Sequence, residues 1–330
     1  MNRWALGALL LAMLAVAVLL GVRFGSVPIS TADVWAVLMG GGDAPTREII
    51  LRLRLPRALL ALLVGGGLAI AGATFQALLR NPLAEPYILG ISGGASVGAV
   101  LILALGWAAA GSWVLPLAAF AGALLAIALV FRVATAAGRV MDVRVLLLAG
   151  VVIAAFFSAC IAFILSVSPA RTVQSAVLWI MGSLAAASWR SVSLAAVYTL
   201  PATLLLMGLA RPLNLMAIGE ETAHHLGADV EGVKRLALVI AALITASGVA
   251  VAGVIGFVGL VVPHAVRLLV GSDHRALLPL SFLAGGAFLT LADLVARLAL
   301  APTEIPIGVI TAFVGVPFFL ALLRRSVSAA

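Results

Sequence analysis

The chain has 330 residues, of which 64% are hydrophobic and only 10% are charged. Soluble domains carry about 25% charged residues, so this composition excludes an ordinary soluble enzyme and indicates a protein that crosses a membrane many times. The net charge of +8 comes from basic residues scattered between apolar runs, whereas a phosphate-binding surface needs them clustered on one face. We therefore expect no nucleic-acid partner.

Ten apolar segments, bounded by charges or by proline and glycine, follow one another along the chain. They are residues 6–22, 56–79, 87–107, 113–134, 143–167, 192–210, 236–255, 257–270, 277–300 and 307–323. No strand-like alternation persists, so the sequence predicts an all-α polytopic membrane protein, residues 1–330, with about ten transmembrane helices in one domain. The eighth segment is too short to span comfortably, and we expect it to pack within the bundle. Small residues four apart, such as Gly94 and Gly98, indicate close helix packing.

The loop before the second segment holds four arginines within "REIILRLRLPR": Arg47, Arg52, Arg54 and Arg57. Placing Arg3 in the cytoplasm puts most other basic loop residues there as well, as the positive-inside rule expects, and makes both termini cytoplasmic. The arginine cluster is then outside. An exposed basic patch on the outer face suits an acidic partner.

Residues 211–235 form the only long hydrophilic interval predicted on the cytoplasmic side. Its apolar positions have the spacing of one or two short amphipathic helices, and a glycine can end each helix: Leu215, Met216, Ile218 and Leu226, with Gly219 and Gly227. Apolar and acidic side chains together predict a docking element for another protein; a solvated loop is the alternative. His224 and His225 point in different directions and lack further ligands, so no metal site is expected.

Two other functions have a basis in the residues. "GISGG" is similar to the nucleophile motif of rhomboid-like intramembrane serine proteases, with Ser92 as nucleophile and His264 as the only base within a span. An ion-coupled secondary transporter would need a free carboxylate or histidine near mid-membrane, but Asp293 can pair with Arg297 at i, i+4. The single lysine, Lys234, lies outside any G-x-x-x-x-G-K-[ST] motif, so ATP coupling would require another subunit.

Four stretches carry a resemblance to a known family: "LRLPRALLALLVGGGLAIAGATFQALLRNPLAEPYILGISGGA", "GEETAHHLG", "GFVGLVVPHAVRLLVGSDHRALLP" and "ADLVARLALAPTEIPIGVITAFVGVPFF". From about Arg52 onward the chain resembles the permease subunits of type II ABC importers for iron siderophores, haem and vitamin B12. The resemblance implies a homodimer in the inner membrane, two ATPase subunits that bind ATP and Mg, and a substrate-binding protein on the outer side. The permease itself would bind no cofactor. Iron siderophores are the most common substrates in this family, so an iron siderophore is the first expectation for the metal-chelate substrate. Cobalamin and haem are the next candidates.

The resemblance also implies roles for particular residues. Arginines that meet acidic residues of the binding protein are matched by Arg54, Arg57 and Arg297, whereas Arg47 and Arg52 match less securely and their role is open. The coupling helices that enter a cleft in the ATPase are matched by Leu215, Met216, Ile218, Gly219, Glu220, Glu221, His224, Leu226 and Gly227. In such importers the substrate passes between the two permease subunits. Positions that close the cytoplasmic end of this substrate path are matched by Asn81, Leu83, Met141 and Asp142. The fifth and tenth helices would line most of that path.

Overall fold

The computed structural model describes residues 2–109, 112–135 and 141–328; residues 1, 110–111, 136–140 and 329–330 lie outside that description. Within the described residues, seven helical stretches are long and apolar enough to cross a membrane: Arg3–Arg23 (α1), Ala44–Leu78 (α3, η1 and α4), Val114–Thr135 (α6), Val143–Ser166 (α7), Trp189–Gly208 (α9), Val230–Ala252 (α12) and His274–Leu298 (α14). Shorter apolar stretches of this part of the chain are Ile91–Ala104 (α5), Val258–Val270 (α13) and Ile307–Ala321, which is the first part of α15 (Ile307–Ser328). Each of these stretches overlaps one predicted segment, and the all-α membrane fold is confirmed.

Short helices occupy several of the connections. The structure places α10 at Ala210–Ile218 and α11 at Glu220–His225, where one or two amphipathic helices were expected. Three others were not predicted: Thr31–Leu38 (α2), Ala44–Glu48 (α3) and Ala170–Ile180 (α8). The sequence did carry a signal for α2, because Ser30 and Asp33 form a capping box at its start.

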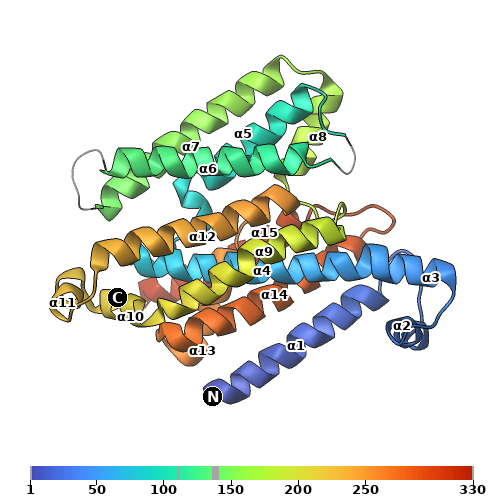
Figure 1. The fold of residues 1–330 in the computed structure, drawn as a ribbon, viewed down its shortest axis with the longest axis horizontal. Helices are drawn as coiled ribbons and strands as arrows, with labels where there is room; N and C mark the ends of the chain where they lie inside the picture. The colour runs from blue at the N-terminus through green and yellow to red at the C-terminus, as the bar shows by residue number, and fades with distance from the viewer. Residues whose placement is uncertain (1, 110–111, 136–140, 329–330) are drawn as a thin grey trace.

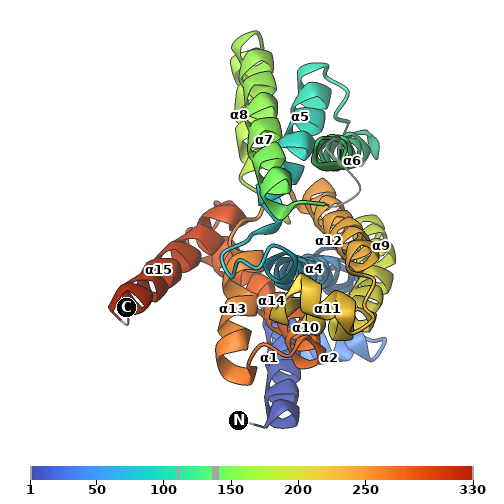
Figure 2. The same cartoon turned by 90° about the vertical axis from the view of Figure 1, so that its left-hand side faces the viewer.

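Helix α4 (Leu55–Leu78) lies at the centre of the molecule and is the most buried of the long helices. It packs against α14, α12, α13 and α9, and α1 covers the outer side of α14. Helices α5 to α8 form a second group beside this bundle, where α5 and α6 contact α12 (Figure 1), and Figure 2 shows α15 reaching away from the bundle. In Figure 1 the two chain termini lie toward the end that holds α10 and α11, and α2 and α3 lie at the opposite end.

Glycines allow the central helices to cross with their backbones in contact. A Cβ atom on Gly72 of α4 would lie 1.9 Å from the carbonyl oxygen of Gly259 in α13. The same helix meets α14 at Gly65, where an added Cβ would lie 2.3 Å from the oxygen of Gly285. The prediction that Gly94 and Gly98 mark close packing is also confirmed, because added Cβ atoms there would lie 2.2 and 2.1 Å from carbonyl oxygens of α6. No side chain fits at such crossings.

The membrane helices α7, α12 and α14 each begin just after an aspartate. The side chain of Asp142 accepts a hydrogen bond from the Arg144 amide at 2.7 Å and caps α7. Asp229 and Asp273 cap α12 and α14 in the same way. These carboxylates satisfy amide groups that the first turn leaves without a partner, so they are helix caps at loop positions.

The short helix α13 packs against α4, α14 and α15, which confirms the expectation for residues 257–270. Its entry is unusual because Phe257 has a φ of 68°, a conformation that a bulky side chain rarely adopts. The Glu85 carboxylate holds it by accepting a hydrogen bond from the Phe257 amide at 2.6 Å. Burial raises the pKa of Glu85, although this hydrogen bond acts in the opposite direction.

Candidate functional site

Arg54 is a buried residue that holds the end of the first helix. It is the last residue of a π-helical turn, Ile49–Arg54 (η1), which leads into α4. Its guanidinium donates to the carbonyl oxygens of Val22 at 3.1 Å and Arg23 at 2.6 Å, and also to that of Val27. The side chain therefore binds the negative end of the α1 dipole and the chain that leaves it.

Arg57 and Arg297 share one buried carboxylate. The Asp293 side chain is 2% exposed, and it lies 2.9 Å from Arg57 NH2 and 3.1 Å from Arg297 Nε. Arg57 also pairs with Glu304 at 2.9 Å, and Arg297 donates to the carbonyl oxygens of Gly21 and Phe24. The predicted i, i+4 pair of Asp293 and Arg297 is thus confirmed, and it extends to α4.

The structure brings the three predicted docking arginines together but corrects the expectation that they form an exposed patch. Arg54 and Arg297 are only 6% and 8% exposed, and the side chain of Arg57 is 12% exposed. Their donors are used by carbonyl groups and carboxylates of this chain, because packing α1 and α14 against α4 encloses them. Arg47 and Arg52 are instead exposed, and Arg52 pairs with Glu48 at 3.0 Å. Docking by these arginines stays a prediction.

Replacing Arg54 with methionine is expected to lower the free energy of unfolding by about 2–3 kcal/mol, because three carbonyl groups lose a charged donor. The matched control is Arg52→Met, which removes a side chain that is 73% exposed and should cost less than about 1 kcal/mol. Thermal unfolding of the detergent-purified protein, followed by tryptophan fluorescence, measures both. Equal shifts for the two variants would contradict the role given to Arg54.

The predicted coupling residues at the α10–α11 end fall into an exposed group and a buried or partly buried group. Ile218 and Leu226 are 72% and 61% exposed, and Glu221, His224 and Gly227 are exposed as well. Met216 is buried, and Leu215 and Glu220 are partly buried. Exposed apolar side chains beside an acidic residue favour a protein contact over a solvated loop. Gly219 joins the two helices with a φ of 151°, which favours glycine.

A network of charges connects this end to the neighbouring helices. The Lys234 ammonium lies 2.9 Å from Glu220 and 2.5 Å from Glu231, and it donates to the Met141 carbonyl oxygen at 3.1 Å. Arg80 pairs with the other oxygen of Glu220 at 2.5 Å. Burial acts to raise the pKa of Glu220, but the hydrogen bonds and charges of Lys234 and Arg80 outweigh it and hold the pKa below its usual range.

The four predicted gate residues lie at two places at this end, in the loop after α4 and directly before α7. Asn81 accepts a hydrogen bond from the Leu83 amide at 2.9 Å, and Leu83 lies with His264 around a small hollow near α15. Met141 is buried and Asp142 caps α7. Lys234 was not predicted as part of this region. The sequence did contain a signal for this role. Lys234 is the only lysine of the chain, and it stands three residues after Glu231, a spacing at which the two side chains can pair on a helix.

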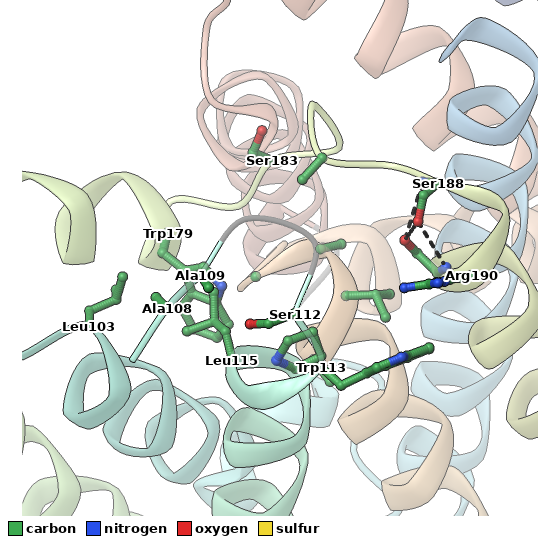
Figure 3. Close-up of a pocket in the computed structure, with 17 residues that line it drawn as sticks. Leu103, Ala108, Ala109, Ser112, Trp113, Leu115, Trp179, Ser183, Ser188 and Arg190 are labelled. Carbon is green, nitrogen blue, oxygen red and sulfur yellow. Dashed lines mark hydrogen bonds between the residues drawn. The ribbon is translucent and has the colours of Figure 1, made fainter. Parts of the chain in front are cut away.

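A cavity of about 380 Å³ lies near the other end of the molecule, where the α5–α6 and α8–α9 connections meet the end of α12 (Figure 3). Trp113 and Trp179 contribute its aromatic lining, and Arg190 lies at one side. The Ser112 hydroxyl is buried there without a hydrogen-bond partner. This cavity was not predicted from the sequence, because its lining comes from three separated stretches of the chain.

Ser92 and His264 do not form a nucleophile and base pair in the described structure. Ser92 lies in the first turn of α5, whereas His264 is in α13 with its ring 6.3 Å from that of Phe318. The Nδ1 atom of His264 is buried without a hydrogen-bond partner, and no hydrogen bond joins it to Ser92. A serine hydrolase requires that contact, so the geometry does not support proteolysis.

Sequence comparison identifies relatives over almost the whole chain. The sequence model of the FecCD transport family matches residues 13–325. The cobalamin import system permease of Halobacterium salinarum is 46% identical over 90% of this chain and 79% of its own length. The vitamin B12 import system permease of Escherichia coli is 41% identical over 89% of both chains. An uncharacterized ABC transporter permease of Bacillus subtilis is 43% identical over 98% of this chain and 94% of its own.

Solved structures agree with these relatives. A metal-chelate type ABC transporter in an inward-facing conformation is similar with a TM-score of 0.84 and 32% identity, over 96% of this chain and 97% of that chain. PsaBC from Streptococcus pneumoniae has a TM-score of 0.53 at 17% identity over 81% of this chain and 90% of that chain, which shows a likeness of fold alone. The family match and the identity to named permeases lead to one conclusion. The chain belongs to the FecCD transport family and is an ABC importer permease.

Proposed function

We propose that this permease moves a metal chelate into the cytoplasm, with a cobalamin as the first substrate to test. The observation that carries the proposal is the 46% and 41% identity to permeases named for cobalamin and vitamin B12 import. Iron siderophores and haem are the next candidates, because the solved transporter of similar fold is described only as a metal-chelate type. Cobalamin therefore moves ahead of the siderophore that prevalence alone favoured.

A second copy of the chain would complete the path. The fifth and tenth membrane helices, α7 and α15, leave large apolar side chains uncovered: Leu148, Val151, Val152, Phe156 and Phe163 on α7, and Phe313, Val314, Val316 and Leu320 on α15. Figure 2 shows α15 extending away from its own bundle, where a partner subunit or lipid can cover it. Two copies around a two-fold axis would place these helices along the path of the chelate.

Two ATPase subunits would bind at the α10–α11 end and carry the ATP and Mg that this chain has no motif to hold. The exposed Ile218 and Leu226 support this contact, because they offer apolar anchors beside Glu221. Both termini lie toward the same end in Figure 1, so they would be cytoplasmic in the inner membrane. Movement of α10 and α11 would then open and close the turns at Asn81, Leu83, Met141 and Asp142.

The substrate-binding protein would dock at the α2–α3 end. Arg47 and Arg52 are the exposed cations of the predicted cluster, and Arg57 reaches the surface beside Glu304. Arg54 and Arg297 would act indirectly, by holding in place the segment that carries the exposed Arg47 and Arg52. Such rim charges mainly raise the association rate and are screened by salt.

The secondary-transporter alternative is disfavoured by the surroundings of Asp293. This carboxylate lies inside α14 but pairs with two arginines, Arg57 and Arg297, so it has no freedom to carry an ion across the membrane. A transporter that uses ATP through another subunit does not need such a group. The family match supports that choice.

Reconstitution into proteoliposomes tests the proposal. The permease would be co-purified with its ATPase and binding protein, and uptake of cyanocobalamin, haemin and a ferric hydroxamate siderophore would be measured with and without ATP. We expect ATP-dependent uptake of cyanocobalamin only with all three proteins present. Uptake without the ATPase would favour a secondary transporter, and selective uptake of another chelate would replace cobalamin as substrate. Mass spectrometry of the molecule retained by the binding protein provides an independent identification.

A further inference from the structure

Lys234 stands at the junction of four chain segments. Its side chain is 2% exposed, and its ammonium contacts α11 through Glu220, its own helix through Glu231, and the turn before α7 through the Met141 carbonyl oxygen. Arg80, just after α4, joins the same Glu220. Met141 is held on both sides, because its amide donates to the second oxygen of Glu231 at 3.0 Å. A movement of α11 would therefore reach Met141 through the Glu220–Lys234 ion pair and the hydrogen bonds that Lys234 and Glu231 make to the Met141 backbone.

The two helices of the coupling segment are attached to different parts of the bundle. In α10, Asn214 donates to Asp273 at 2.8 Å and accepts from the His274 amide at 2.8 Å, which fastens α10 to the start of α14. In α11, Glu220 is fastened to Lys234. Between them, Gly219 is open on nearly all sides, with only the Thr222 hydroxyl 3.6 Å from an added Cβ. This arrangement allows α11 to turn about Gly219 while α10 stays with α14.

We propose that Lys234 is a positioning residue that transmits displacement of α11 to the turn at Met141, and so couples the ATPase contact to the cytoplasmic closure of the path. This inference rests on the proposed function. A buried ammonium suits the role because Glu220 and Glu231 both pair with it, so its removal breaks the ionic link between α11 and α12 and leaves Glu220 with Arg80 alone. A merely structural role would lower stability without changing the response to nucleotide.

The first measurement needs no substrate. Hydrogen–deuterium exchange of the segment 141–147 would be followed in the permease–ATPase complex, with and without a non-hydrolysable ATP analogue. We expect the wild type to show a nucleotide-dependent change of about tenfold in exchange rate, and Lys234→Met to abolish that difference. Lys234→Arg keeps a cation and should retain the difference. Arg144→Met removes an exposed cation from α7 that makes no ion pair in the described structure, and it serves as the charge-loss control.

The second measurement is transport of cyanocobalamin per ATP hydrolysed. Lys234→Met is expected to keep ATP hydrolysis but to lower this ratio about tenfold, with Lys234→Arg and Arg144→Met near the wild type. Should Lys234→Met fail to fold, Glu220→Gln tests the same link, because it leaves the Lys234 pair with Glu231 in place. Either folded variant keeping both the exchange difference and the wild-type ratio would overturn the proposal. A wild-type complex that moves no cyanocobalamin would count against that substrate, and the exchange measurement would still decide the role of Lys234.

Discussion

Replacing Asp293 with asparagine is expected to lower the free energy of unfolding by about 3–5 kcal/mol, because it removes the carboxylate from a buried ion pair network. Two enclosed arginines would lose their shared anion. Arg57 would keep only the partly exposed Glu304, and Arg297 would keep only the carbonyl oxygens of Gly21 and Phe24. The expected result in thermal unfolding of the purified protein is a strongly lowered midpoint and loss of monodisperse material.

Glu304→Gln is the matched control for this experiment. It removes the other carboxylate of Arg57, whose side chain is 40% exposed, and should cost less than about 1 kcal/mol. Adding Arg297→Met to Asp293→Asn should recover part of the loss, since one of the uncompensated charges is then gone. Similar midpoints for Asp293→Asn and Glu304→Gln would show that the buried network contributes little.

Replacing Gly72 with alanine is the second change expected to have a large effect. Its methyl group would lie 1.9 Å from the Gly259 carbonyl oxygen, and backbone atoms cannot rotate away as a flexible side chain can. Overpacking of this kind costs typically about 1–3 kcal/mol, and we expect the upper end or beyond because α4 and α13 must separate along their crossing. Measurement of the folded fraction by size-exclusion chromatography and of the thermal midpoint would show the loss.

Gly248→Ala provides the control for this prediction. This glycine lies in α12, where an added Cβ would meet Val64 Cγ1 at 3.6 Å, an ordinary contact. Alanine is favoured over glycine within a helix by about 1 kcal/mol, so this variant should be as stable as the wild type or more so. If both alanine variants had the same thermal midpoint, the close crossing at Gly72 would not be important for the stability of the protein.

The membrane helices could be predicted from sequence because each span must be apolar over most of its length. The position of α13 was predictable from its length. It is too short to span the bilayer, so its ends must be covered by protein and the helix must pack within the bundle. The amphipathic α8 was missed because its eleven residues lie in a polar interval after Ser168 that has no strong apolar run. Hydropathy alone finds spans but not such surface helices.

The site was predicted less completely because its contacts join distant residues. The sequence indicated that Arg54, Arg57 and Arg297 belong together, but not that they are buried. Their burial depends on carbonyl groups at the end of α1 and on Asp293, more than 200 residues from Arg57. Local spacing did reveal the pair of Asp293 and Arg297. It could not reveal that Lys234 meets Met141, because the α6–α7 connection is brought to α12 only by folding.

The contacts of α1 set an order for assembly of the protein. At one end of α1, Arg3 pairs with Asp273 at 2.8 Å, and at the other end Arg297 donates to the Gly21 and Phe24 carbonyl oxygens. Both partners belong to α14 or to its cap. Arg54 can bind the carbonyl oxygens at the end of α1 early in synthesis, whereas the contacts with α14 form only after the chain has been made as far as that helix. Until then α1 is held at one end by Arg54 alone, and its full attachment depends on α14.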